Sequence, residues 1–422
     1  MFKSIRGTKD ILPNEQKYWE YFKTNAFDLA SIFGFKRIDT PTFESTDLFL
    51  RGIGLDTDIV TKETYSFTDR GENNITLQPE GTASVCRSYI ENGMFNQPQP
   101  IKLYYFTSIF RYERPQSGRL REHHQFGIET IGSHDPELDA EIISFAWTLL
   151  KKIGLTNINL SINSIGDITD RKQFITELSQ YYKNSGWAKN NCSDCTQRIS
   201  TNPLRILDCK NSNCKNYIKD SPNIISFLSE KNLKHFENVK KYLELGKINY
   251  QVNNNMVRGL DYYTHTVFEI ISDQDKRQNA IVGGGRYNGL IEKIGGNETP
   301  GVGFGMGVER VINEIINNKI KLHQKENDSI LFIYLTNSSK SKAIEFNIIA
   351  RKNNIKSELA ISSRSLKSNM RYANNLKFSA IVIIGDPEEK LNYITYKELN
   401  TGDQKYINEK ELIDLITNSK FN

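Results

Sequence analysis

The sequence has 422 residues, of which 38% are hydrophobic and 25% are charged, and its formal net charge at pH 7 is +5. This length and composition suit two or three folded domains and exclude a disordered chain. The N-terminus MFKSIRGTKD lacks the apolar segment of a signal peptide and no apolar run reaches membrane-spanning length, so we expect a cytoplasmic protein without membrane contact.

The first predicted element is an antiparallel hairpin between Phe106 and Gly132. Its sequence, FTSIFRYERPQSGRLREHHQFGIETIG, has two arms rich in Phe and Ile around a polar turn. The arginines of the hairpin are Arg111, Arg114, Arg119 and Arg121. Each guanidinium is permanently charged, and its planar fork matches two oxygens of one phosphate, so the hairpin favours a nucleoside triphosphate or a nucleic-acid backbone. A solvated basic loop is the alternative.

Four of the five cysteines follow with the spacing C-x2-C-x13-C-x4-C. They are Cys192, Cys195, Cys209 and Cys214. This spacing suits a tetrahedral zinc site. The second pair is looser than in a zinc knuckle, so we expect reduced free thiols and keep zinc as the alternative, while a disulfide does not suit the cytosol. The fifth cysteine, Cys86, is predicted to pack in the core.

The segment Val257–Ile270 reads VRGLDYYTHTVFEI. It predicts a short charged turn that leads into a strand, and we place Tyr262 and Tyr263 in that strand because aromatic residues favour strands. Arg258 lies in the turn, where backbone can come close.

The segment Thr299–Ile315, TPGVGFGMGVERVINEI, predicts a glycine-studded strand that runs into an amphipathic helix, with Arg310 in its first turns. Glycine at every second position leaves one face of the strand bare, so a flat ring can lie against the backbone. Met306 breaks the dinucleotide pattern GxGxxG, and no GK[ST] occurs in the sequence. Nucleotide binding is therefore expected to depend on arginines.

The polar stretch KLHQKEND, residues 321–328, indicates a linker. Beyond it, ILFIYL, IEFNIIARKNN, SLKSNMRYANNL and AIVIIG alternate as strand, helix, helix and strand, which predicts a small α/β domain over residues 329–422. Nine basic and two acidic residues between Lys340 and Lys377 give that window a charge of +7. Such a stripe can bind a phosphate backbone, with a solvated charged helix as the alternative.

Seven stretches, in this order, resemble class II aminoacyl-tRNA synthetases and specifically histidyl-tRNA synthetases. They are RGTKDILP, GFKRIDTPTFE, TLQPEGTASVCR, the arginine hairpin, RGLDYYTHTVFE, GGGRYNGLIEKIGG and GFGMGVER. The resemblance covers nearly the whole chain. It implies an α+β catalytic domain on a mixed, mainly antiparallel sheet over residues 1–320, with a mostly helical module inserted at residues 167–250. The C-terminal α/β domain would then bind the anticodon.

The resemblance also implies the activity. The chain would activate L-histidine with ATP and Mg²⁺ to histidyl-adenylate and transfer it to the 3′ end of tRNA(His). Neither step needs a covalent enzyme intermediate, so the protein positions substrates and stabilises charge. The segment around Thr40 and Pro41 matches the class II dimer motif, which implies a homodimer.

The site residues implied by the resemblance fall into four groups. Arg258 and Arg111 are the catalytic candidates, at the α-phosphate. The ATP contacts are Arg111, Glu113, Arg119, His123 and Arg310. The histidine contacts are Glu80, Gly81, Thr82, Arg111, Gln125, Glu129, Arg258, Tyr262, Tyr263 and Tyr287. Arg114 and Gln116 are placed at the acceptor end of the tRNA.

Histidine selection has a chemical requirement of its own. A neutral imidazole has one donor and one acceptor, and a buried pocket must match both. The resemblance assigns this role to Glu129 and Tyr263.

Two departures from the family are visible: Gln78 stands where arginine is usual, and His123 stands where phenylalanine is usual. We expect weaker or differently tuned substrate binding from them.

Two other functions are alternatives to the ligase activity. One is a non-catalytic regulatory paralogue in histidine biosynthesis, which lacks the C-terminal domain. The other is a class II synthetase for threonine, proline or glycine, against which RGLDYY and Glu129 argue.

Overall fold

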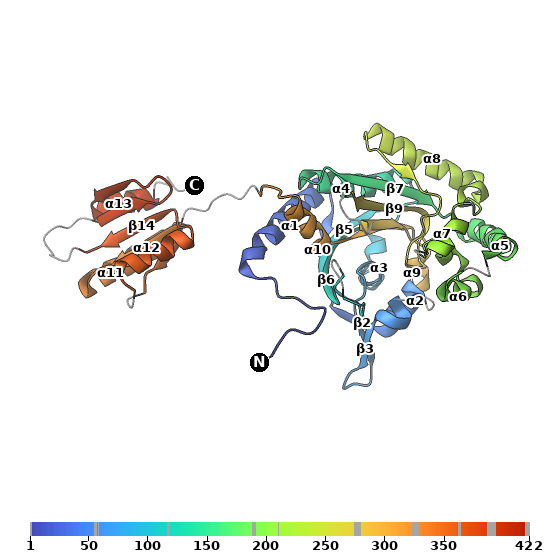
Figure 1. The fold of residues 1–422 in the computed structure, drawn as a ribbon, viewed down its shortest axis with the longest axis horizontal. Coiled ribbons are helices and arrows are strands. Elements are labelled where there is room, and N and C mark those ends of the chain that lie inside the picture. Colours follow the sequence, from blue (N-terminus) through green and yellow to red (C-terminus); the bar gives the residue numbers. More distant parts are fainter. Residues whose placement is uncertain are drawn as a thin grey trace. The chain divides into compact units, whose positions relative to one another are not determined.

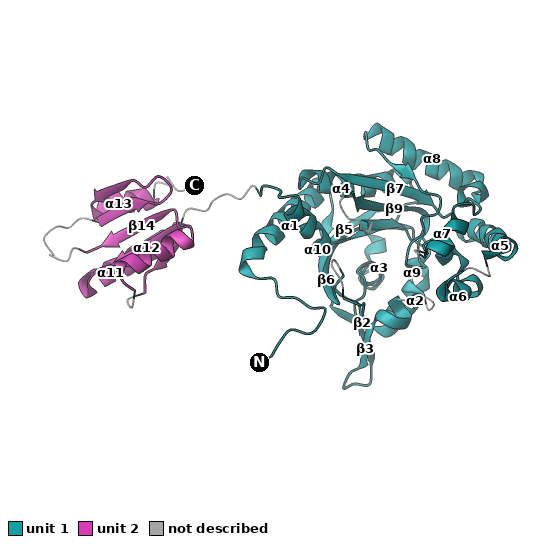
Figure 2. Cartoon of the chain, viewed as in Figure 1, with its two compact units in different colours: residues 1–322 teal, residues 323–422 magenta. Residues whose placement is uncertain are grey.

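The computed structural model describes residues 2–54, 57, 59–115, 119–187, 191–209, 211–273, 280–322, 329–361, 364–385 and 394–417, and the structural statements below concern these ranges. The chain divides into two compact units, residues 1–322 and 323–422 (Figure 2). Most of the predicted linker, residues 323–328, lies outside the described residues. Within the described ranges, none of the helices has both the length and the apolar character of a membrane span.

A mixed sheet of eight strands forms the centre of the first unit (Figure 1). The strands lie in the order β1 (Lys36–Arg37), β5 (Ile101–Phe110), β6 (Glu122–Ile131), β11 (Gly301–Gly307), β10 (Ala280–Arg286), β9 (Thr264–Ser272), β7 (Ile158–Ser164) and β8 (Gln251–Val252). The five inner pairs are antiparallel, and the two outer pairs, β1 with β5 and β7 with β8, are parallel. The predicted mixed, mainly antiparallel sheet is thus confirmed.

The arginine hairpin consists of β5 and β6, with Phe106 opposite Phe126. Its prediction is confirmed, but the placement of Tyr262 and Tyr263 in a strand is wrong, because β9 begins at Thr264. The reason lies in the neighbouring strands. β10 ends at Arg286, which pairs with Thr264, so no strand partner remains for the two tyrosines.

Glycine and apolar residues alternate strictly along β11, so the two faces of the sheet differ at this strand. Val302, Phe304 and Met306 point into the larger hydrophobic core, whereas the glycines between them point to the opposite face. The core face is covered by helices α1 (Pro13–Ile32), α4 (Pro136–Lys152), α8 (Glu230–Leu245) and α10 (Val308–Asn317). The glycine face is therefore the one left for a site.

A buried ion pair fixes α4 to the sheet. Nε of Arg286 donates to Oδ2 of Asp139 at 2.7 Å, and its other nitrogens donate to the main-chain oxygens of Ser133 and Asp135 at 2.9 and 2.7 Å. Burial opposes a charge on Asp139, but Arg286 and then His235 outweigh burial, and the pKa of Asp139 falls to about 2. This network holds the end of β10 in place.

Shorter elements complete the glycine side of the sheet. Helix α3 (Thr82–Glu91) packs against β5 and β6 in a second hydrophobic core, with Cys86 fully buried in it, as predicted. A small sheet of β2 (Phe43–Ser45), β4 (Asn74–Leu77) and β3 (Tyr65–Thr68) lies nearby, in that strand order. The remaining elements are α2 (Thr46–Ile53), η1 (Ile59–Glu63), η2 (Met94–Asn96) and α9 (Leu290–Lys293).

The chain between β7 and β8 is helical, which confirms the predicted helical insertion. Before α8 it contains α5 (Ile168–Asn184), α6 (Ser193–Thr201), η4 (Pro203–Ile206), α7 (Ser212–Ile218) and η5 (Ile224–Phe227). Asp167 caps α5 by accepting from the main-chain nitrogens of Thr169 and Asp170. Phe174, Tyr182 and Trp187 bury their side chains in the same core as α3.

The second unit is a five-stranded α/β domain. Its strands lie in the order β13 (Lys356–Leu359), β12 (Ser329–Tyr334), β14 (Ala380–Ile384), β15 (Ile394–Glu398) and β16 (Gln404–Ile407). Helices α11 (Asn337–Lys352) and α13 (Glu409–Thr417) cover one face and α12 (Leu366–Asn375) the other. The four predicted elements are confirmed; the prediction missed the less apolar β13, β15, β16 and α13. The basic window covers α11, β13 and α12.

Candidate active site

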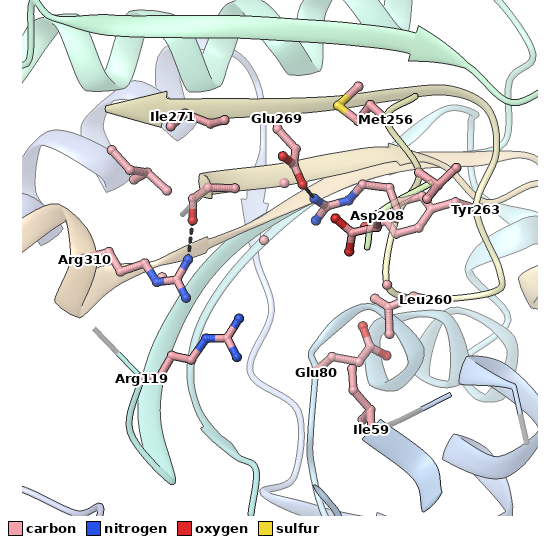
Figure 3. Close-up of a pocket in the computed structure, with 18 of the residues that line it drawn as sticks. Ile59, Glu80, Arg119, Asp208, Met256, Leu260, Tyr263, Glu269, Ile271 and Arg310 are labelled. Atoms are coloured by element: carbon pink, nitrogen blue, oxygen red, sulfur yellow. Dashed lines mark hydrogen bonds and ion pairs between the residues drawn. The ribbon is translucent and has the colours of Figure 1, made fainter. Parts of the chain in front are cut away.

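A cavity of about 700 Å³ opens on the glycine face of the eight-stranded sheet (Figure 3). Its walls come from the β5–β6 hairpin, from β9, β10 and β11, from the start of α10 and from the helical insertion. A cavity of this size can enclose a nucleotide and an amino acid together. Segments that are far apart in the sequence thus form one site.

Most of the predicted site residues line this cavity. They are Glu80, Thr82, Arg111, Glu113, Arg119, His123, Gln125, Arg258, Tyr262, Tyr263 and Arg310. Gly81, Glu129 and Tyr287 are buried beside the cavity without lining it. Arg114 is exposed on the hairpin loop, and Gln116 lies outside the described residues.

Arg258 is held against the floor of the cavity. It forms an ion pair with Glu269 of β9, and its guanidinium lies directly over Gly283 of β10, where a Cβ atom would be only 1.9 Å from Nη2. Burial alone would lower the pKa of Arg258, but the Glu269 carboxylate outweighs this and raises it. The ring centroid of Tyr263 is 5.7 Å from Cζ of Arg258. The arginine is therefore charged and positioned from three sides.

Arg111 and Arg310 reach the same space from other walls. Nε of Arg111 donates to the main-chain oxygen of Pro79 at 2.7 Å, and its terminal nitrogens have no protein partner within the described part of the chain. Nη1 of Arg310 donates to the main-chain oxygen of Ala280. A main-chain oxygen thus anchors each guanidinium, which suits the binding of an oxyanion in the cavity.

The outer part of the cavity holds Arg119, Glu113 and His123. Arg119 is paired with Glu113 at 3.3 Å, and Figure 3 shows Arg119 and Arg310 directed toward the same space. Burial, followed by the charges of Arg111 and Arg310, lowers the pKa of His123 to about 3. The imidazole is therefore neutral at pH 7 and can stack on an aromatic base.

Glu80 places a buried carboxylate at the inner end of the cavity. It accepts hydrogen bonds from the main-chain nitrogens of Thr82 and Ala83, at 2.9 and 2.7 Å, at the start of α3. The hydroxyl of Tyr262 donates to the same carboxylate at 3.2 Å. Burial nevertheless raises the pKa of Glu80. Such a carboxylate gains most from a cationic ligand such as an ammonium group.

Glu129 forms a second buried carboxylate behind Thr82. Its two oxygens accept from the hydroxyls of Thr82 and Tyr287, both at 2.7 Å. The side chain covers Gly303 of β11, where a Cβ atom would be 1.8 Å from Oε2. Burial raises the pKa of Glu129 to about 8, although both hydroxyls lower it. The glycine face of β11 is therefore partly covered by side chains, and the expectation of a bare face applies only to its end near the cavity.

Gln125 completes this buried group on β6. Its Oε1 accepts from the hydroxyl of Tyr105 at 3.1 Å and from the main-chain nitrogen of Gly81 at 3.3 Å. The position of its amide is thereby fixed at the cavity wall.

The two departures from the family pattern have different positions. His123 lines the cavity, whereas Gln78 is fully buried and donates from Nε2 to the hydroxyl of Thr107 and to the main-chain oxygen of Ser108 on β5. Gln78 therefore contributes to the packing of the hairpin and does not line the cavity.

Several lining residues were missed by the sequence interpretation. Glu269 had a signal, because the alternation in THTVFEI places its carboxylate on the same face as Val267, toward Arg258. Glu309 also had a signal, because it is the glutamate of the motif GVER, next to Arg310. Its carboxylate accepts from the main-chain nitrogen of His124 at 2.9 Å. Asp208 and Lys215 of the insertion had no such signal.

The cavity can therefore bind a polyanion along its arginines and an ammonium group at Glu80. Comparison with known proteins agrees with this chemistry. The family model described as histidyl-tRNA synthetase matches residues 7–311, and the model of an anticodon binding domain matches residues 330–419.

Individual relatives match over almost the full length. The histidine–tRNA ligase of Thermoanaerobacter pseudethanolicus is 45% identical over 416 residues, which cover 99% of this chain and 99% of the relative. That of Halothermothrix orenii is 44% identical over 412 residues, covering 98% of both. The crystal structure of apo Staphylococcus aureus histidyl-tRNA synthetase has a TM-score of 0.83 and 36% identity, covering 99% of this chain and 100% of that one.

Proposed function

The chain belongs to the histidyl-tRNA synthetase family, and from this premise we propose how its cavity carries out the reaction. Its activity is that of a histidine–tRNA ligase of class II: ATP-dependent activation of L-histidine and charging of tRNA(His) for protein synthesis. The matches favour this activity over a regulatory subunit or a synthetase for another amino acid.

Activation joins the histidine carboxylate to the α-phosphorus of ATP. One carboxylate oxygen forms the new P–O bond, the bond to the bridging α–β oxygen breaks, and pyrophosphate leaves with the electron pair. Negative charge is redistributed over the α-phosphate during this exchange. We assign its stabilisation to Arg111 and Arg258, which approach the cavity from the hairpin and from the turn before β9. The convergence of these two anchored guanidinium groups is the observation that carries the proposal.

The rest of the nucleotide fits the outer part of the cavity. Arg310 and Arg119 would bind the outer phosphates, Glu113 lies near the adenine position and the neutral His123 ring would stack on the base. Mg²⁺ would enter as MgATP. No carboxylate cluster able to hold an ion by itself is found around the cavity within the described residues, so phosphate oxygens would supply most of its ligands.

The amino acid fits the inner end. Its ammonium group would bind near Glu80, Thr82 and Gln125. The imidazole would be selected by Tyr263 together with the buried group of Glu129 and Tyr287. The remaining predicted contacts, Gly81 and Tyr262, support this pocket, because the Tyr262 hydroxyl orients Glu80 and Gly81 binds Gln125.

Transfer needs the tRNA to reach the same cavity. We place its 3′ end over the hairpin loop, with the exposed Arg114 as a contact, and its anticodon on the C-terminal domain.

We also propose a cytoplasmic homodimer. Phe43, close in sequence to the Thr40–Pro41 segment, and Phe67 are exposed on the small sheet. They are the kind of apolar surface that a partner subunit would cover.

The first experiment is amino-acid-dependent ATP–pyrophosphate exchange with each of the twenty amino acids, with Mg²⁺ and without tRNA. Exchange with histidine alone is expected. Exchange with a different amino acid would overturn the pocket assignment, and no exchange with any amino acid would overturn the assigned active site.

A second experiment separates the tRNA contact from the chemistry. Arg114→Ala should leave pyrophosphate exchange unchanged and slow the charging of tRNA(His), whereas Arg111→Ala should abolish both. Equal charging by Arg114→Ala and the parent enzyme would remove Arg114 from the tRNA contacts.

A further inference from the structure

The four cysteines of the insertion meet at one point in the structure. Cys192 and Cys195 lie at the start of α6, Cys209 follows η4, and Cys214 lies in α7. All four Sγ atoms lie within 4.8 Å of one another, and those of Cys192 and Cys209 are 3.7 Å apart. Three of the four residues are buried. Three short segments therefore converge on one cluster of sulfur atoms.

The distances are those of a metal site. Four sulfurs bound to zinc at about 2.3 Å in a tetrahedron are about 3.8 Å apart. The cluster needs only a small contraction to reach this geometry. The main-chain nitrogen of Cys192 donates to Sγ of Cys214 at 3.4 Å, which is the kind of hydrogen bond that orients a metal ligand. Folding of α7 brings Cys214 back toward Cys209, so the looser spacing of this pair does not prevent a site.

We propose that Cys192, Cys195, Cys209 and Cys214 bind one Zn²⁺ as a tetrahedral structural site. Binding replaces the four thiol protons with the metal, so no oxidant or reductant is involved. All four positions of the metal are then filled by protein ligands, which excludes a catalytic role for the ion and leaves a structural one.

The surroundings explain what such a site would do. Helices α6 and α7 have nine and seven residues, which is too short for stability on their own. The metal would tie them to the segment that follows η4. That segment, with Leu207, Asp208 and Cys209, forms part of the cavity wall. The site would therefore hold the wall of the cavity in place.

Two contacts connect η4 and the residue before it, which lead into this segment, to the turn that carries Arg258. The side chain of Asn202 donates to Oδ1 of Asp261 at 3.2 Å. A Cβ atom at Gly259 would be 3.5 Å from Nη1 of Arg205, so these two stretches of the polypeptide lie in contact. We infer that loss of the metal loosens this wall and weakens substrate binding. This consequence, unlike the metal site itself, rests on the proposed active site.

Metal analysis of the full chain tests the site directly. Protein purified with reductant, without a metal-affinity tag, should contain about one zinc per chain by mass spectrometry of metals. Co²⁺ exchanged into it should show the visible bands of a tetrahedral tetrathiolate. A mercurial that blocks thiols should release the zinc. The proposal would be overturned if protein from cells grown with added zinc contained almost no zinc. Such protein would have either all five thiols titratable or two disulfides.

Two cysteine variants test whether zinc binding depends on the four clustered cysteines in particular. Cys195→Ser should lower the zinc content and the Co²⁺ absorbance severalfold, while Cys86→Ala, which removes a buried cysteine outside the cluster, should leave both unchanged. If Cys195→Ser does not fold, zinc release from the parent protein decides the question. Zinc-depleted protein should show a rise of about tenfold in the KM for histidine or ATP with a smaller change in kcat. Zinc at full occupancy without exchange activity would refute the active site and leave the metal site intact.

Discussion

The close contact between Gly283 and Arg258 allows a strict test of the proposed chemistry. In Gly283→Ala the new methyl group would lie 1.9 Å from Nη2 and 2.5 Å from Cζ of Arg258. Ordinary contact begins at 3.4 Å, so the guanidinium must move. The required shift is about 1.5 Å, which is large for a group that must meet a transferring phosphate.

The size of the effect follows from this displacement. A misplacement of about 1 Å costs on the order of a hundredfold in rate, and loss of one charge-stabilising donor costs roughly 10²–10³-fold. We therefore expect kcat/KM for histidine-dependent pyrophosphate exchange to fall about a hundredfold, or ~2.7 kcal/mol. The fold should persist, because the clash is with the end of a flexible side chain and the backbone of Gly283 is not left-handed.

Gly289→Ala is the matched control. It adds the same methyl group nearby in the sequence, at a position where the Cβ atom meets nothing within 4 Å. Exchange by this variant should equal that of the parent, and thermal melting should show both variants folded. A folded Gly283→Ala enzyme with kcat/KM within about threefold of the parent would refute the role assigned to Arg258.

Three further tests concern Arg286, Glu129 and His123. Arg286→Met leaves Asp139 buried without its cation, so the free energy of unfolding in urea should fall by about 3–5 kcal/mol, and adding Asp139→Leu should restore much of it; no recovery would contradict this account. The folded pKa of Glu129, about 8, lies above its usual value of 4.5, so its contribution to stability is fully present below pH 4.5 and is lost as the pH rises toward 8. Glu129→Gln should flatten that part of the pH–stability curve. His123→Phe should lower the KM for ATP roughly 2–10-fold through better stacking, and an unchanged KM would remove His123 from the ATP contacts.

Local patterns in the sequence identified the parts of the catalytic unit. The β5–β6 hairpin followed from alternating Phe and Ile residues around a polar turn, and the arginine-bearing segments followed from residue type. Alternation of glycine and apolar residues in VGFGMG also assigned the two faces of β11, because side chains in a strand point to opposite sides in turn. These signals lie within a few residues of one another, so the sequence carries them without the fold. The residue roles came from motif resemblance, which also depends on local sequence.

Contacts between distant segments needed the tertiary structure. The β9–β10 register places Glu269 and Gly283 against Arg258. From the sequence, glutamine at position 78 suggested altered substrate binding. The structure buries Gln78 against β5, where it donates to Ser108, and so assigns it a role in packing.

In the helical insertion, too, the sequence did not show which distant residues meet. Cysteine spacing alone left free thiols as the expected state, whereas the packing of α6 and α7 brings all four sulfurs together and places Asp208 and Lys215 in the cavity wall. Pairing between distant residues depends on strand register and helix packing, which are properties of the whole chain. The sequence therefore determined which chemical groups are present and on which elements, and only the folded structure decided which of them meet.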